Sequence, residues 1–156
     1  MSMSSCLICD RIALIESGDN PYFVKELATG YVVLGDHQFY RGYTLILFKR
    51  HVTELHVLDA DVRRKFLDEM ALVGKAVWRA FEPQKLNYEI LGNTDPHLHA
   101  HIFPRIITDT DFSKPIWNTP EAIRKSEATR PTSEELGVLK ETLLGALMHC
   151  LRSIPR

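Results

Sequence analysis

The sequence is short of cysteine, of long apolar runs and of net charge, and each shortage excludes a class of protein. Its three cysteines are an odd number, which argues against a secreted scaffold held together by disulfides. No apolar run approaches the ~20 residues of a membrane span, and the N-terminus lacks the basic and long apolar regions of a secretory signal. We therefore expect a cytoplasmic protein without a membrane partner.

The charged side chains nearly cancel, because 19 Lys and Arg stand against 20 Asp and Glu, a formal net charge of -1. Such a chain lacks the overall positive charge with which proteins bind nucleic acid, so no nucleic-acid partner is expected. A pocket for a phosphate needs only local donors, and Lys49, Arg50 and Arg105 are candidate substrate-binding donors. With 156 residues, 45% of them hydrophobic, the chain is expected to form a single domain over 1–156.

The apolar periodicity predicts an α+β fold. Most of the strand-like stretches are joined by short links, which favour antiparallel neighbours, and one long amphipathic helix interrupts them. The expected helices span 6–17, 60–81 and 133–151, and the expected strands span 22–27, 31–35, 43–49, 87–92 and 97–103. Residues 6–105 are expected to form the core of the domain. Residues 106–156 form a C-terminal extension, of which 107–131 are expected to cross the surface as a long excursion.

Several element ends carry local signals. Asp59 is placed to cap the helix that follows it, and Thr132 with Glu135 forms a capping box before the last helix. Pro104 has no N–H and is expected to end strand pairing. Cys150 falls in an apolar helical pattern and is expected in the core.

The strongest chemical signal is the stretch HLHAHIFPR, residues 97–105. In a strand, side chains alternate between the two faces, so His97, His99 and His101 share one face while the apolar residues between them pack on a core. Successive histidines on that face lie about 6–7 Å apart. Imidazoles titrate near neutral pH and can act as nucleophile, acid or base. The pattern therefore indicates a site for one phosphate or one metal ion.

Four motifs of the chain match one known family. His97-Leu98-His99-Ala100-His101-Ile102-Phe103 fits its signature of three alternating histidines. Gly42-Tyr43-Thr44-Leu45 resembles its Gly-His-Thr-Leu strand entry, with Tyr in place of His. Lys49-Arg50-His51 resembles Pro-Lys-x-His, and Cys6-x-x-Cys9-Asp10 resembles the start of bacterial members. On these motifs the chain resembles the histidine triad (HIT) nucleotide-binding superfamily. The Pro104-Arg105 that follows the triad is similar to its dinucleoside polyphosphate hydrolase and fragile-histidine-triad members.

The resemblance implies an antiparallel sheet with one long helix, in a homodimer whose two sheets join. It also implies an enzyme that acts on the α-phosphate of a dinucleoside polyphosphate or a nucleoside phosphoramidate containing AMP or GMP. His99 would be the nucleophile that forms a covalent nucleotidyl-histidine. His101 would contact the phosphate and help the leaving group depart, and His97 would support the nucleophile. Positive charge shared by His97 and His101 would stabilise the transition state.

The resemblance also assigns substrate contacts outside the histidines. Asn93 and Thr94 stand where many members have glutamine and serine or threonine, and both can donate hydrogen bonds to the phosphate or the leaving group. Asp36 matches the aspartate that binds the ribose hydroxyls, His37 is placed to flank the base, and Leu34 matches a base-lining position. From the residues alone, Asn93 is equally a turn residue, Asp36 an ordinary loop carboxylate and Leu34 a core residue.

A second candidate site combines Cys6 and Cys9 with His51 and His97, and it resembles the structural zinc set of some bacterial members. Two cysteines and two histidines are ordinary tetrahedral zinc ligands. The two cysteines could instead be buried thiols. A thioredoxin-like redox role is disfavoured because no βαβ pattern surrounds them. Catalysis by the histidines would itself require no cofactor.

Two other functions stay open at this point. The chain could bind nucleotides with little turnover. It could also use His97, His99 and His101 as the ligands of a catalytic zinc ion, although rings at every second position splay along a strand. The group beyond the α-phosphate would be read by residues after Arg105, where Trp117 could stack on a base, contact a partner subunit or belong to the core.

Overall fold

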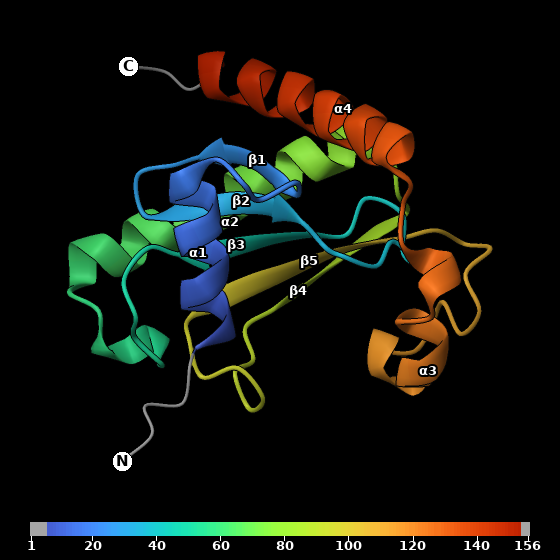
Figure 1. Cartoon of the computed structure of the whole chain (residues 1–156), viewed down its shortest axis with the longest axis horizontal. Coiled ribbons are helices and arrows are strands. Elements are labelled where there is room, and N and C mark those ends of the chain that lie inside the picture. The colour runs from blue at the N-terminus through green and yellow to red at the C-terminus, as the bar shows by residue number, and fades with distance from the viewer. Residues whose placement is uncertain (1–5, 154–156) are drawn as a thin grey trace.

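The computed structural model of this chain, which describes residues 6–153, contains one five-stranded antiparallel sheet with the order β1-β2-β3-β5-β4 (Figure 1). The strands are Phe23–Glu26 (β1), Gly30–Leu34 (β2), Thr44–Phe48 (β3), Lys85–Glu89 (β4) and His99–Arg105 (β5). Helices pack against this sheet, so the predicted α+β fold class is confirmed. The predicted domain also includes residues 1–5 and 154–156, which lie outside the described residues.

Helices cover both faces of the sheet (Figure 1). α2 (Ala60–Phe81) packs on β3 and β5, and α4 (Ser133–Arg152) packs on α2 and β1. α1 (Leu7–Ser17) lies on the other face and buries Ile8, Ile12 and Ile15 against side chains of β2 and β3. These three helices confirm the predictions for 6–17, 60–81 and 133–151. No helix in the part of the chain that the structure describes is long and apolar enough to cross a membrane.

Strand alternation decides what each face of the sheet presents. Leu98, Ala100 and Ile102 are fully buried in the core beneath α2 and α4, as their alternation predicts. His99 and His101 point to the opposite face, where they line a cavity. The apolar side chains of α1 cover β2 and β3 on that face, so β5 is the strand that faces the cavity with its histidines.

The last two strands lie two or three residues away from their predicted positions. β4 is Lys85–Glu89 rather than 87–92, and β5 is His99–Arg105 rather than 97–103. Pro104 does not end the pairing as predicted, because it lies opposite Leu86 of β4. Pairing with β3 ends at Ile102. The missing N–H of Pro104 therefore leaves no β3 carbonyl without its donor. The shift leaves His97 in the loop before β5.

The helix ends follow the predictions in part. Thr132 and Glu135 form the predicted capping box of α4, with both reciprocal hydrogen bonds present. Asp59 occupies the N-cap position of α2, but its side chain makes no capping hydrogen bond. Cys150 is buried in the core as predicted.

Glu69 is a buried carboxylate that no local pattern signals. From the middle of α2 it accepts hydrogen bonds from the backbone N–H groups of Ala28 and Thr29, at 2.9 and 3.0 Å. These groups belong to the turn between β1 and β2 and have no partner in the strand ladder. Glu69 therefore ties the edge of the sheet to α2.

Between β5 and α4 the chain forms three short helical turns, Ile116–Asn118 (η2), Glu121–Arg124 (α3) and Glu127–Thr129 (η3). We call residues 115–130 the wall segment. The loop after β2 holds it in place, because the N–H of Gln38 donates to the Thr129 carbonyl at 2.7 Å and the Tyr40 hydroxyl bonds that of Thr119 at 3.0 Å. Ile116 is fully buried. Most residues of 107–131 are exposed, as the predicted surface excursion requires, and these contacts hold the segment beside the histidine face of the sheet.

Candidate active site and metal centre

A cavity of about 580 Å³ lies on the histidine face of the sheet, and both α1 and the wall segment contribute to its lining. Most of the predicted site residues line it: Leu34, Asp36, His37, Asn93, Thr94, His99 and His101. His97 and Arg105 are predicted site residues that do not line it, and the candidate donors Lys49 and Arg50 do not line it either. The wall segment adds four lining residues that the sequence does not identify as a group: Trp117, Glu121, Arg124 and Lys125.

His99 is held with one ring nitrogen ready to react. Its Nδ1 lies 2.5 Å from the carbonyl oxygen of His97. A carbonyl can only accept, so Nδ1 carries the proton and Nε2 keeps its lone pair. The ring is also the immediate neighbour of His101, with 4.7 Å between ring centroids. His99 therefore has the orientation that a nucleophilic imidazole requires.

His101 is a neutral ring in this structure. Burial, together with the neighbouring His99, lowers the pKa of His101 from 6.5 to about 3. Its Nδ1 lies 2.7 Å from the hydroxyl of Tyr43, and burial strongly raises the pKa of Tyr43, which keeps the phenol protonated. Among the described residues this hydroxyl has no other acceptor, so it donates to Nδ1 and the ring proton stays on Nε2.

The expected positive charge on the flanking histidines is therefore not found in the unliganded protein. Burial lowers the pKa of His97 as it does that of His101, because a charged imidazole loses its hydration inside the protein. At neutral pH both rings act as neutral hydrogen-bonding groups.

Tyr43 fixes the orientation of His101 through its hydroxyl, and removing this hydrogen bond is the first test of the site. Its ring stacks on Phe103 with 4.1 Å between centroids, and it lies so close to Gly35 that a Cβ there would clash with it. Replacing Tyr43 with Phe should keep this stacking and remove only the hydrogen bond to His101. Since a hydrogen bond of this kind is worth about 1–2 kcal/mol, we expect kcat to fall about tenfold.

Steady-state kinetics and a thermal melt check this prediction together. The melting temperature should stay close to that of the wild type, because the ring still fills its place. Tyr31→Phe is the matched control, since Tyr31 is buried under α1 and does not line the cavity. An unchanged kcat for Tyr43→Phe, or an equal loss in Tyr31→Phe, would show that the hydrogen bond does not position His101.

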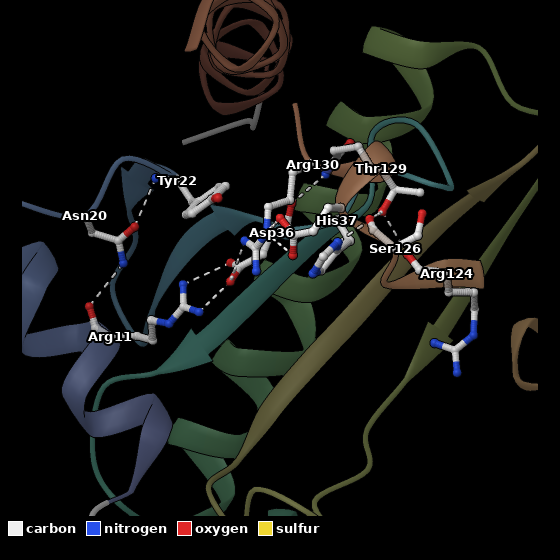
Figure 2. Close-up of polar contacts among 12 residues, drawn as sticks. Arg11, Asn20, Tyr22, Asp36, His37, Arg124, Ser126, Thr129 and Arg130 are labelled. Atoms are coloured by element: carbon white, nitrogen blue, oxygen red, sulfur yellow. Dashed lines mark hydrogen bonds and ion pairs between the residues drawn. The ribbon is translucent and has the colours of Figure 1, made fainter. Parts of the chain in front are cut away.

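At the other end of the cavity, Asp36 is already bound by an arginine (Figure 2). Arg11 of α1 donates from Nη1 to Oδ1 at 2.9 Å and from Nη2 to Oδ2 at 2.5 Å. Arg130 lies 3.9 Å from the same carboxylate, and His37 bonds the hydroxyl of Thr129 at 3.0 Å. Asp36 keeps accepting capacity for a ribose hydroxyl, because a carboxylate has about four lone-pair sites.

Arg105 lies away from the cavity, and its polar contacts account for its position. Its side chain is 2% exposed. The guanidinium donates to Asp109, to Asn87 and to the backbone carbonyls of Lys114 and Asp111. It also lies over the ring of Tyr40. The structure therefore gives Arg105 the role of organising residues 109–114 rather than that of contacting a substrate.

Cys6, Cys9, His51 and His97 come together as a set of four ligand atoms that all lie within 4.8 Å of one another. Nδ1 of His97 is 3.5 Å from each sulfur and 3.3 Å from Nδ1 of His51. A tetrahedral zinc ion with ordinary bond lengths separates its sulfur and nitrogen ligands by about 3.3–3.6 Å. Four of the six separations in this cluster match that range, so the residues present fit a zinc ion.

The second nitrogen of His97 supports this interpretation. Nε2 lies 2.7 Å from the backbone carbonyl of Phe48, so Nε2 carries the proton and Nδ1 faces the other three ligands with its lone pair. Metal-binding histidines usually donate their other N–H in this way. Cys6 is also the N-cap of α1, so a metal here would fasten α1 to the loop before β5.

The same geometry argues against a catalytic zinc ion held by all three triad histidines. The ring of His97 faces the two thiols, while His99 and His101 line the cavity. Nδ1 of His99 and Nδ1 of His101 are already bound, to the His97 carbonyl and the Tyr43 hydroxyl. The three rings do not converge on one point.

Comparison with known proteins identifies the family. The model of the HIT domain matches residues 23–107, which are 85 of the 156 residues. The chain is a member of the HIT family. Nucleotide binding and hydrolysis are the activities of this fold family, and two of the residues that line the cavity of this HIT protein, His99 and His101, belong to the triad.

Solved structures show the same fold. A hypothetical histidine triad nucleotide-binding protein from Sulfolobus tokodaii strain7 has a TM-score of 0.72 and 22% identity, over 94% of this chain and 96% of its own. A histidine triad protein from Bradyrhizobium japonicum has a TM-score of 0.70 and 22% identity, over 80% and 89%. A Zn-bound histidine triad family protein from Mycobacterium smegmatis has a TM-score of 0.61 and 25% identity, over 96% and 98%.

The match to the HIT domain ends before the wall segment. Trp117 and Arg124, which line the cavity, therefore lie outside the part of this HIT protein that the family model describes.

Proposed function

We propose that this protein is a nucleotidyl hydrolase that cleaves a nucleoside phosphate derivative at its α-phosphate through a nucleotidyl-His99 intermediate. The observation that carries the proposal is the hydrogen bond from Nδ1 of His99 to the His97 carbonyl, which leaves Nε2 as the nucleophile. The cavity that His99 lines has the size of a small-molecule site. Its apolar side chains, Leu34 and Ile8 among them, suit a base, and Asp36 suits a ribose.

The reaction divides into two displacements at phosphorus. In the first, Nε2 of His99 bonds to the α-phosphorus and the bond from phosphorus to the leaving group breaks, with its electron pair going to the leaving group. Nε2–H of His101 donates a hydrogen bond to the phosphoryl oxygens or the departing atom. In the second, water attacks the same phosphorus, the electron pair of the P–N bond returns to Nε2 of His99, the water gives up one proton to solvent, and the nucleoside monophosphate leaves. Asn93 and Thr94 line the cavity and would donate hydrogen bonds to the phosphate.

Trapping the intermediate tests the proposal. The purified protein is mixed with a diadenosine polyphosphate or with adenosine phosphoramidate. The reaction is quenched before one turnover is complete, and the protein is analysed by mass spectrometry. We expect a mass increase of one adenylyl group that maps to the peptide containing His99. Turnover without any protein adduct would overturn the covalent mechanism, and binding of AMP without turnover of either substrate would favour the binding module considered above.

We propose zinc as the occupant of the Cys6, Cys9, His51 and His97 cluster, with a structural role. The ligand distances fit a tetrahedral ion, as described above, and a similar protein of 25% identity is Zn-bound. When bound, the ion would supply a cross-link between α1 and the loop before β5. Metal binding requires both thiols to be reduced, which supports the expectation of a reducing compartment such as the cytoplasm.

We propose a homodimer that forms through β4, and a single substitution tests it. β4 is an edge strand, and Tyr88 on it and Trp78 on α2 are 44% and 48% exposed. The Tyr88 hydroxyl lies at Gly74, one helical turn from Trp78. Trp78→Asp should convert a dimer into a monomer in light scattering after size exclusion, because a charge there would be buried at the interface.

Val138→Asp is the control for this substitution, since Val138 is 51% exposed on α4, away from β4. It should leave the measured mass of the particle unchanged. A wild-type protein with the mass of one chain would refute the dimer.

A further inference from the structure

Three cationic side chains other than histidine line the cavity: Arg11, Arg124 and Lys125. Arg11 is bound by Asp36 through two hydrogen bonds, and Lys125 is bound by Glu121 at 2.6 Å. Arg124 makes no ion pair with any residue that the structure describes. It is therefore the cation of the cavity whose charge is left for a ligand.

Arg124 is held in place without using up its charge. Its Nε donates to the Thr119 carbonyl at 2.8 Å, and its guanidinium carbon lies 4.8 Å from the centroid of the Trp117 ring. Trp117 in turn meets His101 and Phe103 edge-on, with centroid distances of 6.3 and 6.2 Å. The two Nη groups of Arg124 make no hydrogen bond to the described residues, so both remain available as donors.

The position of Arg124 matches the leaving-group side of the site. Figure 2 shows Arg11 and Arg124 at opposite ends of the view, with Asp36 and His37 between them. If Asp36 holds the ribose and His99 meets the α-phosphate, a group bonded beyond that phosphate extends past His101 toward Trp117 and Arg124. Burial disfavours a charge on His101 by lowering its pKa, whereas the guanidinium of Arg124 is always charged.

Two carboxylates bear on this side of the site: Glu121, which lines the cavity and pairs with Lys125, and Glu89 of β4. Glu89 stands opposite His101 across the β4–β5 pair, and its Oε2 is buried without a hydrogen-bond partner among the described residues. Burial raises the pKa of Glu89 above its ordinary value, which disfavours the ionised carboxylate. Arg124 is thus the cation on this side of the cavity that forms no ion pair with the described residues, while Lys125 pairs with Glu121.

We propose that Arg124, stacked on Trp117, determines specificity for the leaving group and selects nucleotides whose leaving group is a phosphate or polyphosphate anion. This inference rests on the proposed function. When the α-phosphorus bonds to His99, the electron pair of the breaking P–O bond stays on the bridging oxygen, and the Nη groups stabilise this added negative charge. An amine leaving group departs with a proton instead and gains nothing from a neighbouring guanidinium. The proposed preference is therefore for dinucleoside polyphosphates over nucleoside phosphoramidates.

The test is a selectivity ratio, defined as kcat/KM for diadenosine triphosphate divided by kcat/KM for adenosine phosphoramidate. Losing a charge-assisted contact of about 1.5–3 kcal/mol corresponds to about 10- to 100-fold, so Arg124→Gln should lower the ratio by that factor. Arg79→Gln, at an exposed position in the last turn of α2, is the matched control and should preserve the ratio. A thermal melt of Arg124→Gln shows whether the wall segment still packs.

A second measurement separates binding from folding and from chemistry. In a His99→Ala background, which cannot turn over, the Kd for diadenosine triphosphate relative to that for AMP should rise about tenfold or more when Arg124→Gln is added. An unchanged ratio in both measurements, or a wild-type preference for the phosphoramidate, would overturn the inference. Failure of the proposed function looks different, because then neither substrate gives an adenylyl adduct.

Discussion

Replacing His99 with alanine should abolish turnover while leaving nucleotide binding intact. The variant lacks the Nε2 that bonds to phosphorus, and removal of a nucleophile that acts within a catalytic group costs about 10⁴-fold or more in kcat. Isothermal titration with AMP should still give binding, because the base, ribose and phosphate contacts of the cavity come from other residues. The adenylyl adduct should be absent from the mass spectrum of the quenched reaction.

His56→Ala is the matched control for this prediction, since His56 is exposed in the short helix Leu55–Val57 and does not line the cavity. It should retain wild-type kcat and the adduct. Substantial turnover by His99→Ala would exclude His99 as the nucleophile. The His99 ring also hydrogen-bonds the carbonyl of His97 in the preceding loop. Loss of activity together with a loss of thermal stability would therefore mean that the ring supports the fold.

Removing zinc should strongly lower the free energy of unfolding and leave the reaction at His99 nearly unchanged. A ligand that binds only the folded state at 1,000 times its Kd contributes about 4 kcal/mol to the free energy of unfolding. Chelation, or Cys9→Ser, should therefore reduce that free energy by about 3–4 kcal/mol in denaturant titrations. Below its lowered melting temperature the zinc-free protein should still form the adenylyl adduct, because no proposed step passes through the metal.

Metal analysis completes this experiment. The wild type should contain one zinc ion per chain and Cys9→Ser none, whereas Cys150→Ala should keep the metal, because Cys150 lies in the core away from the cluster. Equal stability with and without chelator would show that the four residues hold no structural metal. An immediate loss of all turnover from a folded zinc-free protein would instead revive a catalytic role for the metal.

Local patterns in the sequence account for most of the fold. Alternation along residues 97–103 determines that Leu98, Ala100 and Ile102 enter the core, because side chains of a strand must point to opposite faces. The spacing of apolar residues along α2 determines its packed face, and the capping box at Thr132 marks the start of α4. These signals act between residues close in sequence, so they can be interpreted before the tertiary structure is known.

The site depends more on contacts between distant segments. Alternation predicts that His97 shares the face of His99, but His97 precedes β5, and its side chain is set by the Phe48 carbonyl and by Cys6 and Cys9 rather than by the strand. Arg105 follows the triad in sequence, yet its guanidinium is hydrogen-bonded to groups within residues 109–114. A motif thus specifies which residue types are present, while packing decides which of them the cavity receives.

The sequence by itself determined the fold class, the core faces of the strands and helices, and the presence of three alternating histidines and of a Cys and His cluster. Only the tertiary structure decided the charge of the site. Burial makes His97 and His101 neutral, Asp36 meets Arg11 across 25 residues of chain, and the wall segment brings Arg124 to the cavity. The physical reason is that desolvation and ion pairing depend on distances in space, which no periodicity of the sequence encodes.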